Sequence, residues 1–445
     1  MMPSEPRQRD AAMSWAVRFQ LRQHLRQSLW AVPLVGAAVG AVLAITDRWL
    51  EDRVSVPSGW SYSASTATSV LSTVSGAMIG LIGLVVTIGV LVVQMATGTL
   101  SPRFMRLWYR DRLQKVVLAS FTATFVFSFA LLREVGEGQV PNVGISLAGL
   151  AVTIDLILLL TYLDRFVHAL RPVAVASAMA RSGLSVIADM EERAGTSARA
   201  GGDTVLDGTT PSLRVHAATS GAIQAMYVRG IMALAEQRDL TCALRHSVGD
   251  FVNVGTALMD VYGASRPADE EKLRGMVALG HERTIDQDPA FAVRIIVDIA
   301  IRALSPAVND PTTATQMINH LGALLAGVGS RDLQAHGALV DSQGVLRVTV
   351  PMRTWDNYLE LGISEIRKYG ATSAQVCRRL RAMLADLETT VTPANQPAVR
   401  RQLAVLDASV TTSFAEGEAR TLALVSDRQG IGGPSIAPEG HRVRG

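Results

Sequence analysis

The chain has 445 residues, 49% of them hydrophobic, and its mean hydropathy of +0.25 is high for a water-soluble protein of this length. The 42 basic and 39 acidic residues leave a formal net charge of +3, and no basic tract is present, which argues against a nucleic-acid partner. The two cysteines show neither metal-type spacing nor a disulfide framework, and we expect no cofactor and no metal.

The N-terminal segment, residues 1–29, is a basic arm with five arginines against two acidic residues. Residues 30–45 (WAVPLVGAAVGAVLAI) predict a first membrane-spanning helix, although crossing the hydrocarbon layer takes about 20 apolar residues. A signal peptide cleaved after Ala44 is the alternative, and it would leave the downstream topology unchanged.

The longest apolar stretch, residues 65–97, predicts a second transmembrane helix. Small or polar residues recur in it at alternating steps of four and three, which places them in one stripe along a helix. The stripe consists of Ser69, Thr73, Gly76, Gly80, Gly83, Thr87 and Gln94. Such a stripe permits close approach of another helix in lipid, or lines a pore.

Two further apolar stretches, residues 116–132 and 143–163, predict a third and a fourth span. The segment between the second and third spans is basic and aromatic, as expected of a short helix at the cytosolic headgroups. The distribution of arginine over the loops follows the positive-inside rule. We therefore predict four spans within residues 30–170 of a bacterial inner-membrane protein, with both termini in the cytosol and lipid as a partner.

One acidic residue, Asp155, falls within the fourth predicted span. A carboxylate at the centre of a bilayer costs about 2.5–3.5 kcal/mol even on insertion scales, so it has to face protein or water. One hypothesis is a proton or cation site. The other is a structural acid held by a hydroxyl, such as Thr122, Thr124 or Ser128 of the third span or Thr87 of the second.

The second half of the chain predicts a cytosolic α+β domain that is mainly helical. Residues 171–212 are expected to form a helix and a flexible linker, 213–264 a small β-rich unit, 265–426 a mainly helical domain and 427–445 a disordered tail. The run GDFVNVGTALMDV in the β-rich unit resembles the turn and strand of biotinyl-type barrels, but it contains no lysine to carry a prosthetic group.

The most distinctive polar stretch runs from His281 to Leu325. We predict a helix over residues 289–303, ended by Ser305 and Pro306, and a second helix capped by Asp310 with Pro311 in its first position. The stretch also contains a candidate polar cluster for a cation or an anion: Arg283, Asp286, Asp288, Asp298, Arg302, Asn309, Asp310 and Thr312.

Three segments carry a resemblance to a known family: RALSPAVNDPTTA, RTIDQDPAFAVRIIVDIA and VLVVQMATGTLSPRF. Together they are similar to an uncharacterised bacterial membrane-protein family, the domain of unknown function twenty-two fifty-four, over most of residues 30–387. The resemblance implies an inner-membrane protein with an N-terminal membrane region and a cytosolic domain. It implies no catalytic or ligand residue.

The sequence leaves three hypotheses on function. The first is a homo-oligomeric channel or transport protein whose second span lines or packs at the axis. The second is a non-conducting membrane-anchored scaffold or sensor whose cytosolic domain binds a ligand or partner of unknown kind. An enzyme is the third and weakest, because the chain contains none of the common linear catalytic motifs.

Overall fold

The computed structural model of the protein describes residues 14–51, 53, 61–99, 111–136, 140–169, 171–194, 198–199, 209–263, 269–333 and 336–433. The chain divides into two compact units. We call residues 23–174 the helical bundle, and residues 14–22 with 175–433 the mixed unit. The predicted headgroup helix and most of the predicted linker lie outside the described residues.

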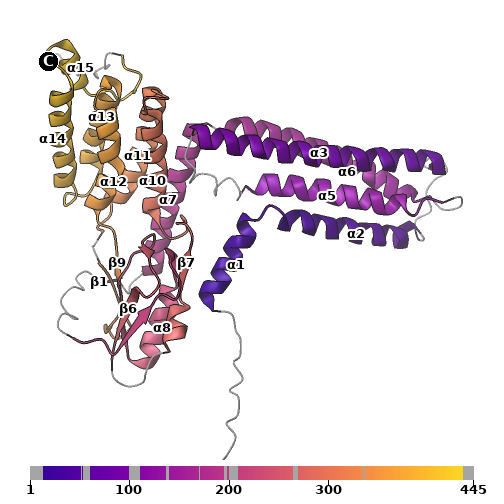
Figure 1. The fold of residues 1–445 in the computed structure, drawn as a ribbon, viewed down its shortest axis with the longest axis horizontal. Coiled ribbons are helices and arrows are strands. Elements are labelled where there is room, and N and C mark those ends of the chain that lie inside the picture. The colour runs from indigo at the N-terminus through magenta and orange to yellow at the C-terminus, as the bar shows by residue number, and fades with distance from the viewer. Residues whose placement is uncertain are drawn as a thin grey trace, which may run out of the picture. The chain divides into compact units, whose positions relative to one another are not determined.

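Four long helices form the helical bundle and run side by side (Figure 1). They are α2 (Ala31–Glu51), α3 (Ala64–Thr99), α5 (Arg112–Leu132) and α6 (Asn142–Ala169). Each predicted span lies within one of them. A fifth helix, α7 (Pro172–Ala194) of the mixed unit, is also long and apolar enough to cross a membrane, so the predicted number of four is not exact.

Helix α5 is the centre of the bundle, because it packs against α2, α3 and α6. The contact with α2 is close at two glycines. A Cβ atom on Gly36 would lie 2.2 Å from the backbone oxygen of Ala119, and one on Gly40 would lie 2.3 Å from that of Ala123. Both glycines therefore let the two backbones touch, as small residues do in membrane helix pairs.

The interior of the bundle contains two apolar clusters. Leu71 of α3, Phe127 of α5 and Ala148 of α6 belong to the cluster at the end where α6 begins. Met78, Phe121 and Leu159 belong to the other cluster. On each of these helices, the residues between the two clusters include polar side chains.

Helix α2 continues past the predicted end of the first span as far as Glu51. The Glu51 carboxylate accepts hydrogen bonds from the backbone N–H groups of Asn142, at 3.0 Å, and Val143, at 3.1 Å. A carboxylate at a helix N-terminus satisfies free N–H groups and complements the helix dipole. The last turn of α2 therefore fixes the start of α6.

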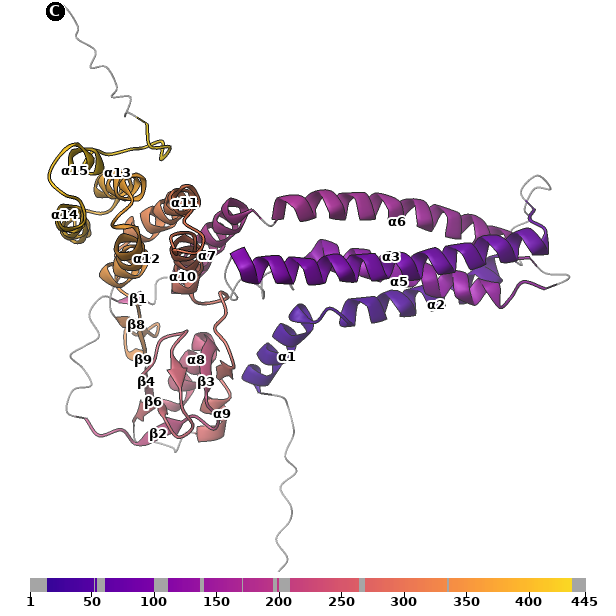
Figure 2. The same cartoon turned by 45° about the horizontal axis from the view of Figure 1, so that its top comes forward.

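Two β-sheets lie in the mixed unit (Figure 2). The six-stranded sheet has the order β1-β8-β9-β4-β6-β2, in which only β4 and β9 pair in parallel, and the three-stranded sheet has the order β5-β3-β7. The strands are β1 (Ala198–Arg199), β2 (Leu213–His216), β3 (Gly221–Met226), β4 (Thr241–Leu244), β5 (Phe251–Val252), β6 (Ala257–Tyr262), β7 (Val277–Gly280), β8 (His336–Val340) and β9 (Leu346–Pro351). The predicted boundary of a β unit at residue 264 is wrong, because β4 takes β9 as its neighbour from beyond that point.

The first described helix, α1 (Trp15–Gln27), begins on the three-stranded sheet. The Trp15 ring stacks on Tyr227, with 5.2 Å between ring centroids, and Ala16 is buried against Ala225 of β3 and Ala278 of β7. The start of the basic arm is therefore part of the mixed unit.

The remaining helices of the mixed unit include the predicted helix of residues 289–303 and the predicted helix capped by Asp310. They are α8 (Val228–Arg238), α9 (Glu270–Arg274), α10 (Pro289–Ala303), α11 (Pro311–Gly329), α12 (Trp355–Gly370), α13 (Ala374–Thr390), α14 (Gln396–Ser413) and α15 (Glu418–Ala423). The predicted cap of α11 is confirmed, since the Asp310 carboxylate accepts from the Thr313 N–H at 2.9 Å. Gly183 of α7 lies against Leu324 of α11 and Ala292 of α10, which joins α7 to these helices.

The predicted disordered tail begins too early, because residues 427–433 are bound to α13. The Arg378 guanidinium donates to the backbone oxygens of Gly432, at 3.0 Å, and Gly433, at 2.8 Å. The Asp427 carboxylate accepts from three backbone N–H groups of the same segment. Residues 434–445 lie outside the described part of the chain.

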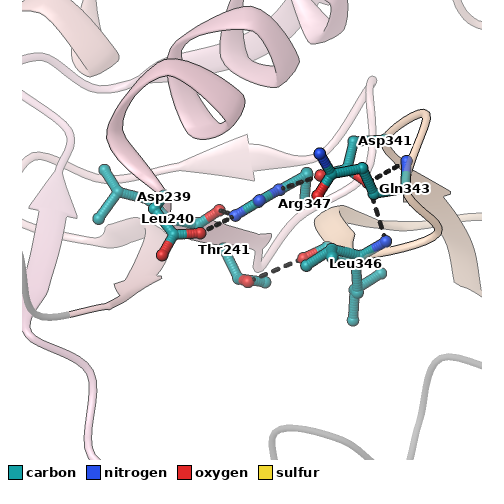
Figure 3. A network of polar contacts seen from close by, with 8 residues as sticks. Asp239, Leu240, Thr241, Asp341, Gln343, Leu346 and Arg347 are labelled. Atoms are coloured by element: carbon teal, nitrogen blue, oxygen red, sulfur yellow. Dashed lines mark hydrogen bonds and ion pairs between the residues drawn. The ribbon is translucent and has the colours of Figure 1, made fainter.

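A buried arginine joins the parallel strands β4 and β9 (Figure 3). Arg347 of β9 pairs with Asp239 at 2.7 Å, before β4, and with Asp341 at 2.8 Å, in the turn before β9. Asp239 has a left-handed backbone with φ of 53°, which ends α8 and directs its side chain to Arg347. The three charges therefore fix the crossing from α8 into the centre of the sheet.

An Arg347→Met substitution is expected to lower the Tm of the mixed unit by about 5 °C, because it leaves two carboxylates without their cation. Arg347 holds the pKa of Asp341 below its usual range. The stabilisation is therefore complete above the normal pKa of an aspartate and is lost as the pH falls through the depressed value. Thermal unfolding at neutral and acidic pH measures both effects. Arg401→Met, at an exposed pair with Asp356, is the control, and an equal loss there would contradict the assignment.

Candidate functional site

The predicted stripe on α3 faces away from the other helices of the helical bundle. All seven of its residues are exposed, whereas the opposite face of α3, with Leu71, Met78 and Val85, is buried against the bundle. A Cβ atom added to Gly76, Gly80 or Gly83 would meet no atom within 4 Å. Within the described part of the helical bundle, the stripe is therefore not a packing seam between α3 and another helix.

The hydroxyl groups of the two threonines in the stripe donate within α3. Thr73 donates to the carbonyl of Ser69 at 2.7 Å, and Thr87 donates to the carbonyl of Gly83 at 2.8 Å. Each hydroxyl oxygen still has a lone pair available as an acceptor. The two threonines can therefore lie in lipid or against another helix without an unpaired donor, and they present oxygen atoms to anything that binds there.

The intramembrane acid Asp155 lies in the buried line of α6, with 0% of its side chain exposed. The Ser120 hydroxyl of α5 donates to its Oδ1 atom at 2.5 Å, and Thr124 also lies close enough to interact with this carboxyl group. Its Oδ2 atom has no hydrogen-bond partner among the described residues. The expected hydroxyl of the third span is thus present, but it comes chiefly from Ser120, whereas Thr122 and Thr87 bond to their own helices.

A second buried acid, Asp47 near the end of α2, was not predicted. Only 2% of its side chain is exposed, and neither carboxylate oxygen has a hydrogen-bond partner in the described part of the chain. It lies against Gly144 of α6. The sequence did contain a signal for this burial, because Asp47 comes two residues after the apolar run of residues 30–45. A first helix one turn longer than predicted would bury it.

The predicted polar cluster of residues 283–312 is not one site. Asp288 precedes α10 and pairs with Arg283, whereas Asp298 pairs with Arg294 on the α10 surface. Asp310 caps α11 beyond the other end of α10, about 22 Å away at 1.5 Å per residue. The prediction of a convergent ion site is wrong, because the length of α10 separates its members.

The other members of that cluster lie in the turn between α10 and α11 or beside it. Asn309 has a left-handed backbone with φ of 48°, and its N–H donates to the carbonyl of Ser305. Thr312 is exposed in the first turn of α11. Arg302 in the last turn of α10 and Asp286 before α10 have further partners. Among the described residues, no group of three or more histidine, cysteine, aspartate or glutamate side chains is placed to hold a metal ion.

The Arg283–Asp288 pair is the most buried part of the predicted cluster. Arg283 donates through Nε at 2.9 Å and Nη2 at 2.5 Å to the same Oδ2 atom of Asp288. Burial raises the pKa of Asp288, and the guanidinium opposes that rise. Gly249, with φ of 95°, lies under the pair, where a Cβ atom would come within 2.4 Å of both side chains. The pair therefore fixes the start of α10 on the turn between β4 and β5.

A family profile described as a predicted membrane protein, DUF2254, matches residues 26–386. An uncharacterised protein of Mycobacterium bovis and one of Mycobacterium tuberculosis are each 29% identical over 426 residues, which cover 92% of this chain and 81% of each relative. No solved structure matches this chain.

Proposed function

The chain belongs to the DUF2254 family of predicted membrane proteins, and we propose that it is a homo-oligomeric, transport-type protein in which α3 helices of several subunits meet along the stripe. The observation that carries the proposal is the exposure of all seven stripe residues on a helix whose opposite face is buried. The stripe spans about 40 Å, enough to cross a bilayer.

The contact between α2 and α5 supports this proposal, because it shows what the same glycine spacing does elsewhere in this chain. Gly36 and Gly40, four residues apart, bring α2 onto the backbone of α5 within one subunit. Gly76 and Gly80 repeat that spacing on α3, with nothing within 4 Å of either. The same spacing on an exposed face supports a second copy of the chain as its partner, since association in lipid depends on close backbone contact.

We further propose that the bundle crosses the inner membrane four times, with both termini in the cytosol. In this topology α7 belongs to the cytosolic domain, because Gly183 lies against Ala292 of α10 and Leu324 of α11 and the helix has a line of buried residues. That line includes Val175, Ala176, Met179, Ala180 and Ile187. A helix with one face committed to a protein core and charged residues on the other fits a cytosolic position better than a bilayer.

A non-conducting scaffold or sensor is the second candidate function, and the close contact between α2 and α5 favours it. The glycines of α2 close the gap to α5 completely, and a contact of that kind between α3 helices would leave no passage at the axis. In this case the bundle would only assemble subunits, and the mixed unit would bind the ligand or partner.

Cysteine cross-linking tests the assembly. Gly80→Cys is expected to give disulfide-linked dimers in native membranes under mild oxidation, because it faces the proposed axis. Ile79→Cys is the matched control, since it is 58% exposed but points about 100° away from Gly80 around the helix. The two native cysteines are buried and should not interfere. Equal cross-linking at both positions would contradict an α3 interface.

Ion flux in proteoliposomes then separates the two candidates. A conducting axis predicts that Gly80→Leu, which fills the stripe, reduces flux at least about tenfold relative to the native protein. If the cross-links form but the native protein and Gly80→Leu give equal flux, the scaffold is the correct function.

A further inference from the structure

We propose that one chain also contains a proton-transfer line through the interior of its helical bundle, between the buried carboxyl groups of Asp155 and Asp47. This line is separate from the α3 stripe and goes beyond the proposed function, because it lies on the inner faces of the helices of a single subunit. We call its members the interior polar line. They are Gln114, Ser120, Thr124 and Ser128 of α5, Ser75 of α3, Tyr162 and Asp155 of α6, and Asp47 of α2.

The central part of the line is on α5. Ser120, Thr124 and Ser128 are four residues apart, so they lie on one face, about 6 Å from one to the next along the axis. Ser120 bonds to Asp155 at one end of this series. Ser75 of α3 lies between Leu71 and Met78, one from each apolar cluster of the bundle, and is therefore close to the level of Thr124.

The far end of the line reaches Asp47. A Cβ atom on Gly144 would meet both Asp47 and Leu131 of α5, which places Asp47 less than one turn beyond the level of Ser128. The charged groups around it are Glu51 on its own helix, Glu134 after α5, and Arg48, which pairs with Glu134 at 2.6 Å. Asp47 therefore connects the buried line to the polar end of the bundle.

The other end of the line continues from Asp155 towards the start of α5. Tyr162 is two turns along α6 on the same buried face, and it is close enough to Asp111 to sense its charge. Gln114 is buried on α5 at this end. Between residues 116 and 132 of α5, and throughout α3, the sequence has no charged residue. The cations of α5 are Arg112 and the buried Lys115, which lies at the Gln114 end of the line and donates to the backbone oxygen of Arg26.

Unpaired atoms distinguish this line from an ordinary apolar core. Buried polar groups of native proteins nearly always have a hydrogen-bond partner. Here a series of buried oxygen atoms has none within the described part of the chain: both oxygens of Asp47, Oδ2 of Asp155, the hydroxyls of Ser75, Ser128 and Tyr162, and Oε1 of Gln114. Oxygens of this kind in a lipid-embedded bundle require water or a proton as partner.

The spacing selects a proton over a metal cation. A hard metal cation needs several oxygen ligands around one point. From Asp155 through Ser120, Thr124 and Ser128 to Asp47, the oxygens follow one another at intervals of up to about one helical turn, which a single water molecule can bridge. A proton leaves the carboxylic acid of Asp155 as each intervening hydroxyl or water accepts one proton and passes one on. The carboxylate of Asp47 gains the proton that Asp155 loses, so the total charge is unchanged.

Proton uptake into proteoliposomes, followed with an enclosed pH-sensitive dye under a membrane potential, tests the proposal. We expect Asp155→Asn to reduce the rate at least about tenfold, and Ser128→Ala to reduce it several-fold. Asp164→Asn is the matched control, because Asp164 lies on the same helix with 81% of its side chain exposed, and it should leave the rate unchanged. An unchanged rate in Asp155→Asn would overturn the line.

Infrared spectroscopy of the purified protein across a pH titration supplies a readout that does not depend on transport. We expect a protonated-carboxyl band that disappears in Asp155→Asn and shifts in frequency in Ser120→Ala, which keeps the acid but removes its hydroxyl donor. A titration identical in all three proteins would overturn the line. If the Asp155 signals are present without Gly80→Cys cross-links, the interior line stands and the oligomeric function fails. If the Gly80→Cys cross-links form but the Asp155 signals are absent, the oligomeric function stands and the interior polar line fails.

Discussion

Gly40→Val is expected to destabilise the helical bundle, whereas Gly80→Val should leave the fold of the subunit intact. At Gly40 the new side chain would start 2.3 Å from the backbone oxygen of Ala123, so α2 and α5 would have to separate. Overpacking of a closed interior costs about 1–3 kcal/mol, and more when the obstacle is backbone. At Gly80 no atom lies within 4 Å, and valine would only widen an exposed face.

Gly40→Val should lower the stability of the subunit, whereas Gly80→Val should weaken the association of subunits. Thermal denaturation of detergent-purified protein is expected to show a loss of at least about 2 kcal/mol for Gly40→Val and less than about 0.5 kcal/mol for Gly80→Val. Size-exclusion chromatography coupled to light scattering is expected to show the reverse for association, with Gly80→Val shifted to a smaller species. A stable Gly40→Val protein would show that α2 does not touch α5 as described.

Local signals in the sequence were sufficient to predict many helices of the mixed unit. The helix of residues 289–303 has the predicted limits, because Pro289 sets its start and Ser305 and Pro306 end it. Asp310 and Pro311 likewise define the start of α11. Capping and proline effects depend on neighbours within one turn, so a single sequence contains all that they require.

Long-range pairing could not be predicted in the same way. Nothing near Cys242 indicates that β4 takes Val348 of β9 as its parallel neighbour, because that choice depends on packing more than 100 residues away. The sequence also drew attention to α3, its most apolar helix, while the centre of the bundle is α5.

For the α3 stripe too, the local geometry could be predicted from the sequence, whereas its long-range packing could not. A period of three and four residues predicted that Gly76 and Gly80 share one face of α3, and the helix has this geometry. Whether that face was buried or exposed depended on the opposite face, whose burial only the assembled bundle determines. Asp47 was missed for a related reason, because its burial results from the extra turn of α2 that holds α6 through Glu51.

Arg378→Met is expected to release residues 427–433 and to destabilise the mixed unit by about 3 kcal/mol. Only 1% of the Arg378 side chain is exposed, and its guanidinium donates to three backbone oxygens, those of Val425, Gly432 and Gly433. Methionine fills most of the volume but donates no hydrogen bond, so those carbonyls lose their buried partner. Limited proteolysis should then cut after residue 426, and thermal unfolding should measure the loss.

A truncation after Ser426 shows whether Arg378 acts through this segment. The truncation removes Asp427. Burial tends to raise the pKa of Asp427, but the backbone N–H groups and Arg378 hold that pKa below its usual value. Truncation should destabilise the native protein more than the Arg378→Met protein, because both changes remove the contacts of Arg378 with Gly432 and Gly433 and those losses cannot add. Additive losses of stability would show that Arg378 stabilises the fold through other partners. Arg400→Met, at an exposed pair with Glu388, is the control, and it should change the free energy of unfolding little in the full-length or the truncated protein.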